Sequence, residues 1–298
     1  MKTKHNSALG VALILLAGTF WGSMGLFVRH LTALGFDSRQ ITAVRLSLAG
    51  LGFALLLLLR EPKGFRIRCR DIPLFLALGL MSILFFTLCY FGAMTRMPLS
   101  TAAILLYTSP IWVTLLSAFF LHEALTRRKL LALALAFSGC ALVSGLSGGG
   151  LTPTGLLLGL GAGLGYGLYS IFGSVALRRY SPFTVTAYTF MIAGLGSWFV
   201  TAPAAFLETL RACPSPGGTV LFLILTALVT AVVPFLCYTL GLRYVEAGRA
   251  AIFATVEPLV ATLFGVLVFH EPLTGLSALG IGLILAAVVI LNRRGNTE

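Results

Sequence analysis

Charged residues are scarce in this sequence. Only 9 of its 298 residues are Asp or Glu and 21 are Lys or Arg, so charged side chains make up 10% of the chain and hydrophobic ones 58%. Soluble domains carry roughly 25% charged residues. Because so few polar side chains cannot cover a water-soluble surface, this composition excludes an ordinary soluble protein and predicts a chain that lies mostly in lipid.

Catalytic and metal-binding patterns are also missing. The sequence has no G-x-x-x-x-G-K-[ST] phosphate loop and no Ser-His-Asp grouping, and its five cysteines have neither metal-site nor disulfide spacing. The pairs His122-Glu123 and His270-Glu271 lack the second His of a zinc-protease motif. We therefore expect no enzyme, cofactor or metal, and we assign Glu123 and Glu271 to capping of the helix that follows each of them.

Apolar runs long enough to cross a bilayer of roughly 30 Å dominate the chain. They predict an all-α integral membrane protein with ten transmembrane helices, at about residues 8–29, 40–59, 72–94, 99–121, 128–146, 154–177, 182–204, 219–242, 248–269 and 274–292. The longer connections, 60–71 and 205–218, are expected to be loops.

Basic residues are distributed unevenly between the two ends of these helices. If the N-terminus is cytoplasmic, 16 Lys and Arg residues fall on that side and 4 on the other, with Arg45 inside a helix. The positive-inside rule then places both termini in the cytoplasm. The formal charge of +12 is thus explained by topology and by contact with lipid headgroups, with no need for a nucleic-acid partner.

One stretch of the chain occurs twice. Residues 89–126 and 237–274 align without a gap, and 12 of the 38 positions are identical, including Cys, Tyr, Pro, His and Glu. Such agreement indicates duplication and divides the chain into two five-helix repeats, residues 8–146 and 154–292. Because five is odd, the second repeat must cross the membrane in the opposite sense, as an inverted-topology repeat.

These residues resemble a known family. The Gly-Thr-Phe-Trp-Gly-Ser run at 18–23, Arg45, the mid-helix Pro110 and Pro258, and a Glu followed by Leu-Thr in each repeat resemble the drug/metabolite transporter superfamily, in its EamA-type ten-helix branch. The resemblance extends over about residues 8–292. It implies a bacterial inner-membrane carrier, often an exporter of amino acids or related metabolites, with a central cavity between the repeats.

Glu257 is the sharpest candidate site residue. It lies well inside the ninth predicted helix, where a carboxylate costs a few kcal/mol, and its repeat partner is Ser109. Pro258 next to it frees a backbone carbonyl and can kink the helix. Two roles stay open for Glu257: a structural or gating joint between helices, and direct contact with substrate or protons.

Arg45 is the second charge inside a helix. It either reaches back to the membrane surface or faces the cavity and pairs with a carboxylate such as Glu257. Together with Pro110 and Pro258, these charges are the candidates for gating.

Aromatic and hydroxyl side chains form the predicted cavity lining: Trp21, Tyr90, Tyr107, Ser109, Tyr166, Tyr169 and Tyr238. Rings with polar tips suit an amphipathic or cationic ligand, although each ring taken singly is explained as well by packing. The glycines four residues apart along the first and sixth helices predict close helix packing.

The sequence thus predicts a secondary transporter of small amphipathic metabolites that works by alternating access. A multidrug or cation exporter of the same fold is the nearest alternative. An integral-membrane lipid-modifying enzyme and a channel are alternatives of a different class, and a nucleotide-sugar carrier would need more cavity cations than Arg45 alone. The expected partners are a small solute and the lipid bilayer, and the sequence does not specify the oligomeric state.

Overall fold

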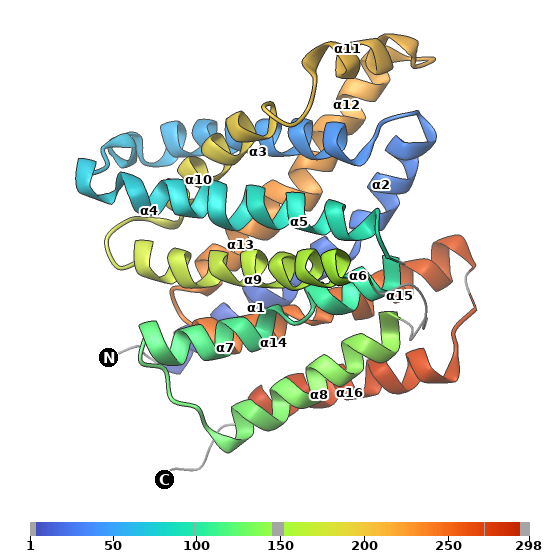
Figure 1. Ribbon diagram of the computed structural model, residues 1–298. Helices are drawn as coiled ribbons and strands as arrows, with labels where there is room; N and C mark the ends of the chain where they lie inside the picture. Colours follow the sequence, from blue (N-terminus) through green and yellow to red (C-terminus); the bar gives the residue numbers. More distant parts are fainter. Residues whose placement is uncertain (1–3, 98, 145–151, 271, 293–298) are drawn as a thin grey trace.

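The structure is a computed structural model that describes residues 4–97, 99–144, 152–270 and 272–292. Every regular element in these ranges is helical, and together they form one bundle (Figure 1). The elements are α1 (Lys4–Gly22), α2 (Met24–Ala33), α3 (Ser38–Arg60), η1 (Pro62–Phe65), η2 (Cys69–Asp71), α4 (Ile72–Leu76), η3 (Ala77–Leu84), α5 (Phe85–Met94), α6 (Leu99–Leu106), α7 (Ser109–Phe120), α8 (Arg127–Ser144), α9 (Pro153–Ala176), α10 (Pro182–Ser197), α11 (Pro203–Ala212), α12 (Pro216–Ala227), η4 (Leu228–Val232), α13 (Val233–Gly241), α14 (Ala247–Ala254), α15 (Val256–Phe269) and α16 (Gly275–Asn292).

Eight helical segments in the described ranges are long and apolar enough to cross a membrane, against the ten predicted. They are Ser7–Ala33, Ser38–Arg60, Cys69–Met94, Thr101–Phe120, Pro153–Ala176, Pro216–Gly241, Ala247–Val268 and Gly275–Asn292. The two predicted helices that do not qualify are α8 and α10. α8 starts with three consecutive basic residues, Arg127 to Lys129, and α10 has only 16 residues.

The bundle has an apolar outer surface and buries hydroxyl groups within a largely apolar interior. Large apolar side chains point outward from the long helices, among them Leu51, Leu267 and Phe119. Hydroxyl side chains are buried between the helices, and many donate to a carbonyl one turn earlier, as Thr189 does to Val185 and Thr226 to Phe222. Because lipid cannot satisfy polar groups, this arrangement is the one expected of a membrane-embedded bundle.

Two of the predicted membrane helices break at their prolines. The break between α6 and α7 lies at residues 107–108, and the one between α14 and α15 lies at Thr255. Pro110 and Pro258 lack the N–H group that would bond the carbonyl four residues earlier. The carbonyls left free in this way are those of Leu106 and Ala254.

The third membrane helix of each predicted repeat contains a π-helical stretch at the same relative place, η3 and η4. Ser82 lies in η3 and donates to the carbonyl of Leu78, and Thr230 lies in η4 and donates to the carbonyl of Thr226. Hydroxyls bonded to a carbonyl one turn back loosen an α-helix, and π-helical turns are often found at functional sites.

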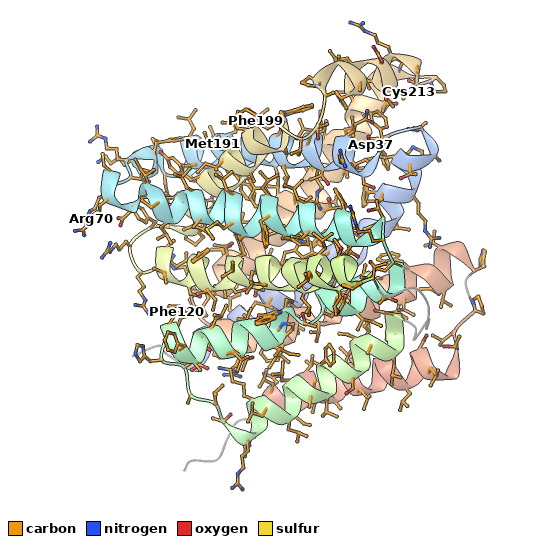
Figure 2. The ribbon with its side chains drawn as sticks, in the orientation of Figure 1. Asp37, Arg70, Phe120, Met191, Phe199 and Cys213 are labelled. Atoms are coloured by element: carbon orange, nitrogen blue, oxygen red, sulfur yellow. The ribbon has the colours of Figure 1, made fainter. Side chains whose placement is uncertain are left out.

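The connection expected as a loop at 205–218 contains a helix, α11, so that prediction was wrong. α11 contacts α12 and leads to the buried Cys213, and the strongly exposed Phe199 follows the end of α10; both residues are labelled in Figure 2. Apolar and charged residues alternate within this segment, for example Leu207 and Glu208. A short amphipathic helix of this kind suits the membrane surface. Because it has no long apolar run, the hydrophobic pattern of the sequence did not predict it.

α1 begins and α16 ends at the same end of the bundle (Figure 1). That end, called here the termini end, also carries the basic connection 61–70, from which Arg70 projects outward, and the end of α7 at Phe120 (Figure 2). Asp71 there accepts from Arg179 Nη1 at 3.0 Å and from the Tyr180 hydroxyl at 2.7 Å. These contacts tie the start of α4 to the turn between α9 and α10.

Candidate functional site

Glycines let two long helices press against the two helix breaks. A Cβ added to Gly18 of α1 would lie 3.2 Å from the carbonyl oxygen of Ala254, and one added to Gly163 of α9 would lie 3.3 Å from that of Leu106. These are the two carbonyls that the prolines leave free. Each free carbonyl is therefore covered by a glycine backbone from the other half of the chain.

The same contact recurs one turn further along both helices. A Cβ on Gly22 would lie 2.7 Å from the carbonyl oxygen of Glu257, and one on Gly167 would lie 3.3 Å from that of Ser109. Ser109 and Glu257 are the aligned residues of the internal repeat. The two helix breaks, together with α1 and α9, thus surround the middle of the bundle with equivalent contacts from the two halves of the chain.

A small cavity lies between these helices. Its lining combines aromatic, hydroxyl and small residues: Trp21, Ser109, Val113, Tyr166, Gly167, Tyr169, Ser170, Phe235, Tyr238, Ala251 and Ala254. Its volume is about 20 Å³, which is room for about one water molecule. In this conformation the cavity cannot hold a metabolite.

Hydroxyl pairs and ring contacts fix the cavity wall. The hydroxyls of Ser170 and Tyr238 lie 2.7 Å apart, and those of Tyr169 and Thr239 lie 2.6 Å apart. The Trp21 ring contacts the rings of Tyr166, Phe235 and Tyr238, with centroids 6.0, 5.0 and 5.4 Å away. Since edge-on ring packing and paired hydroxyls hold side chains in one place, the wall is pre-ordered.

Glu257 adjoins this cavity through Tyr166. The Tyr166 hydroxyl donates to Glu257 Oε2 at 3.3 Å. The carboxylate also interacts electrostatically with Tyr90, Tyr107 and Cys140. The side chain of Glu257 is half-buried.

Arg45 lies inside the bundle and does not extend to the membrane surface. It is 8% exposed, and Nη1 donates to Sδ of Met24 at 3.2 Å. Within the described ranges Arg45 forms no ion pair with Glu257, and its Nε has no hydrogen-bond partner. The two charges nevertheless interact electrostatically, so they are close without touching.

Five of the residues predicted to line the cavity do so, namely Trp21, Ser109, Tyr166, Tyr169 and Tyr238. Tyr90 and Tyr107 lie elsewhere: Tyr90 packs on Phe86, and Tyr107 packs among residues near Cys140. Both still lie in the electrostatic neighbourhood of Glu257. The structure therefore divides the predicted set into a hydroxyl-lined cavity and a polar cluster around the carboxylate, joined by Tyr166.

Phe235 and Thr239 belong to the cavity wall and were missed. Phe235 packs on Trp21, Tyr169 and Phe190, and Thr239 holds the Tyr169 hydroxyl. Both are within four residues of Tyr238 on α13, so helical spacing around that tyrosine pointed to them.

Glu123 caps a helix, but not the one expected. Its carboxylate accepts from the backbone N–H groups of Ala247 at 2.7 Å and Gly248 at 3.1 Å, at the start of α14. The following helix, α8, is capped instead by Thr126, whose Oγ1 accepts from the N–H of Lys129 at 3.2 Å. A short Thr at the N-cap leaves the longer Glu free to reach across the bundle.

Glu271 lies outside the described residues. The two histidines, His122 and His270, both end a helix in the left-handed conformation, with φ of 57° and 54°, a position typical of helix C-termini. No group of three or more His, Cys, Asp or Glu side chains gathers anywhere in the described part of the chain in a way that could hold a metal.

An apolar helical bundle that keeps two opposite charges and a ring of aromatic hydroxyls at its centre has the architecture of a membrane transport protein. Comparison with known proteins specifies the family. The EamA-like transporter family model matches residues 8–145 and again 153–293. This chain belongs to the EamA-like transporter family, within the drug/metabolite transporter superfamily.

Individual relatives agree with this assignment. An uncharacterized transporter of Archaeoglobus fulgidus is 32% identical over 94% of this chain and 95% of its own. The pseudopaline exporter CntI of Pseudomonas aeruginosa is 33% identical over 118 residues, 40% of each chain. A solved crystal structure superimposes with a TM-score of 0.80 at 17% identity, covering 95% of this chain and 96% of that one, which supports the fold alone.

Proposed function

We propose that this chain is a secondary carrier that exports small amphipathic metabolites, zwitterions such as amino acids among them, by alternating access. Its ten helices form two inverted repeats, residues 8–146 and 154–292, and the substrate binds between them beside Glu257. The observation that carries the proposal is the pair of opposite charges, Arg45 and Glu257, kept near each other but unpaired inside an apolar bundle.

Two unpaired charges suit a ligand that carries both charges itself. A charge inside a membrane protein is costly unless it is paired. At close range in a low dielectric, opposite charges such as those of Arg45 and Glu257 attract each other strongly. A zwitterion satisfies both at once: its carboxylate meets the guanidinium fork of Arg45 and its ammonium meets Glu257. The rings of Trp21 and Tyr166 then offer an apolar surface to the remainder of the solute.

The size of the cavity supports a cycle of opening and closing. About 20 Å³ accommodates a water molecule but no metabolite, so substrate enters only when the helices around the site move apart. The matching contacts of Gly18 with Ala254 and of Gly163 with Leu106 support motion related by the repeat symmetry. Inverted repeats that exchange roles in this way are a common basis of alternating access.

α8 and α10 complete the ten helices in this proposal. α8 packs along α16, and α10 packs along α3. Both therefore lie beside helices that are long enough to span the membrane. The 16 residues of α10 extend about 24 Å, which local thinning of the bilayer accommodates. Arg127 and Arg128 at the start of α8 are exposed and would lie at the membrane surface, on the cytoplasmic side expected for the termini.

Export as the direction is supported by the name of the Pseudomonas aeruginosa relative, an exporter. Glu257 also provides the group through which export would couple to proton entry. A cation exporter of the same fold would use Glu257 and the aromatic wall but would have no need of Arg45, and this difference separates the two functions experimentally.

The test is uptake of labelled L-amino acids and of a monovalent organic cation into liposomes that contain the purified protein. We expect both Glu257→Gln and Arg45→Gln to reduce zwitterion uptake by about 10- to 100-fold, the effect of losing one charged hydrogen bond. The exposed Glu208→Gln and Arg39→Gln serve as matched controls and should transport normally. If Arg45→Gln leaves the uptake of both solutes intact and only Glu257→Gln reduces it, the protein is a cation exporter and the zwitterion proposal is wrong.

A further inference from the structure

A second charged group joins the two halves of the chain, away from Arg45 and Glu257. Lys129 Nζ lies 2.8 Å from Glu123 Oε2 and 3.5 Å from Glu246 Oε2. Glu123 also accepts from the N–H groups of Ala247 and Gly248. We call Glu123, Lys129, Glu246 and these two N–H groups the clasp; it connects the α7–α8 connection and α8 to the start of α14.

The clasp is buried although it consists of charges. Lys129 is 2% and Glu123 9% exposed, while Glu246 is 51% exposed. A Cβ added to Gly248 would lie 2.6 Å from Cε of Lys129, so the glycine leaves room for the lysine to lie against the helix start. The contact is therefore a fitted one between the halves and is unlike a surface ion pair, which contributes little.

The clasp lies over the termini end of the cavity. α14 begins at the clasp with Ala247 and Gly248, and one and two turns later its Ala251 and Ala254 line the cavity. Tyr238, another lining residue, interacts electrostatically with Glu123. At the same end Gly10 of α1 packs against Tyr244 and Arg249 donates to the carbonyl of Leu291, so the first part of α1 and the end of α16 are close by.

We propose that the clasp is the gate between the central site and the termini side, and that it must open for the substrate to pass on that side. This inference rests on the carrier function proposed above. A solute leaving the cavity toward the termini has to part α14 from the α7–α8 connection, and the clasp is what joins them. Water entering the gap would hydrate the ammonium and both carboxylates, so opening replaces the ion pairs with hydration and does not leave bare charges behind.

The internal repeat provides the variant that tests the gate. Position 129 aligns with Ser277, whose N–H is accepted by Thr274 Oγ1 at 3.1 Å, as the N–H of Lys129 is by Thr126. Serine is thus already accommodated at the equivalent place in the fold. Lys129→Ser should remove the ammonium while keeping the capped start of α8.

The gate is measured by the distance between spin labels at Leu125→Cys and Arg243→Cys, both exposed positions on opposite sides of the clasp, in a chain whose five cysteines are replaced by Ala. In this parent we expect one short spin-label distance, which corresponds to the closed gate. In Lys129→Ser we expect a second, longer distance, with the ratio of open to closed molecules raised roughly tenfold over the parent. Lys129→Arg, which keeps the charge, and the exposed Lys63→Ser should match the parent.

Glu123→Gln is the second variant, for use if Lys129→Ser does not yield folded protein, because its amide oxygen still accepts from the α14 start. Glu123→Gln should also show the longer distance between the spin labels. Parent-like distances in both Lys129→Ser and Glu123→Gln would overturn the gate. Because the distances are recorded without substrate, this outcome is distinct from a failure of amino-acid transport in the liposome assay.

Discussion

Tyr166 takes part in both polar groups of the site. Its ring packs edge-on against Trp21 in the cavity wall, and its hydroxyl donates to Glu257 Oε2 at 3.3 Å. At the scale of single residues, the side chain that positions the carboxylate is therefore also one that a substrate in the cavity would touch.

Replacing Tyr166 by Phe separates these two roles. The ring contacts remain and only the hydroxyl is lost, so we expect zwitterion affinity to fall by about 3- to 10-fold, the worth of one hydrogen bond, with thermal stability unchanged. Tyr188→Phe is the matched control, because Tyr188 is not among the cavity-lining residues and its hydroxyl donates to the carbonyl of Phe65 and not to Glu257. It should lower the melting temperature and leave affinity intact; equal affinity loss in both variants would contradict the role given to Tyr166.

Residue chemistry was only partly accessible to sequence reasoning. Glu257 and Arg45 stood out because charges are rare in this chain, and the aromatic set stood out by composition. The sequence did not determine that Glu123 reaches α14 and that Lys129 is buried beside it, because both depend on how distant helices pack. A Lys at the start of a helix is indistinguishable in sequence from a basic residue at the lipid surface.

At the scale of elements, glycines determine how closely α1 and α9 pack against the helix breaks. Gly18, Gly22, Gly163 and Gly167 allow backbone contact with the two helix breaks, as their four-residue spacing predicted. Pro258 predicted that the ninth helix could be kinked, whereas Pro110 was recognised only as a mid-helix proline and a candidate for gating. The sequence pattern did not indicate that the free carbonyls would be covered by these glycines, or that η3 and η4 would be π-helical, since both follow from tertiary packing.

A methyl group at Gly163 should therefore be poorly tolerated. Its Cβ would lie 2.7 Å from the carbonyl oxygen of Leu105, a backbone atom that cannot rotate away, so we expect Gly163→Ala to destabilise the protein by about 1–3 kcal/mol. Thermal unfolding in detergent measures the effect. Gly282→Ala in α16, where a Cβ meets nothing within 4 Å, is the control and should unfold no earlier than the parent chain.

At the scale of the whole molecule, the basic connection 61–70 lies at the end of the bundle where α1 begins and α16 ends (Figure 1). Composition and hydrophobic runs predicted a helical membrane protein, the internal repeat predicted two halves, and the resemblance to the drug/metabolite transporters implied a transporter. The family assignment confirms that class. Eight of the ten predicted spans meet the length and hydropathy expected of a membrane helix. α8 and α10 do not, because α8 begins with three basic residues and α10 has only 16 residues.

The orientation of the chain can be read from a native cysteine. Cys69 is exposed in the basic connection, and with a cytoplasmic termini end it should resist a membrane-impermeant maleimide in intact cells and react after permeabilisation. Gly217→Cys in a Cys69→Ser chain lies exposed at the opposite end and should react in intact cells. The reverse pattern would invert the proposed topology.

The small volume of the central cavity has a consequence for the cell's energy supply. Protons cross membranes readily along continuous files of water. A space of about 20 Å³ holds about one water molecule, so this cavity contributes no such file. If the protein is the carrier proposed above, its closed site would hold too little water to conduct protons between transport events.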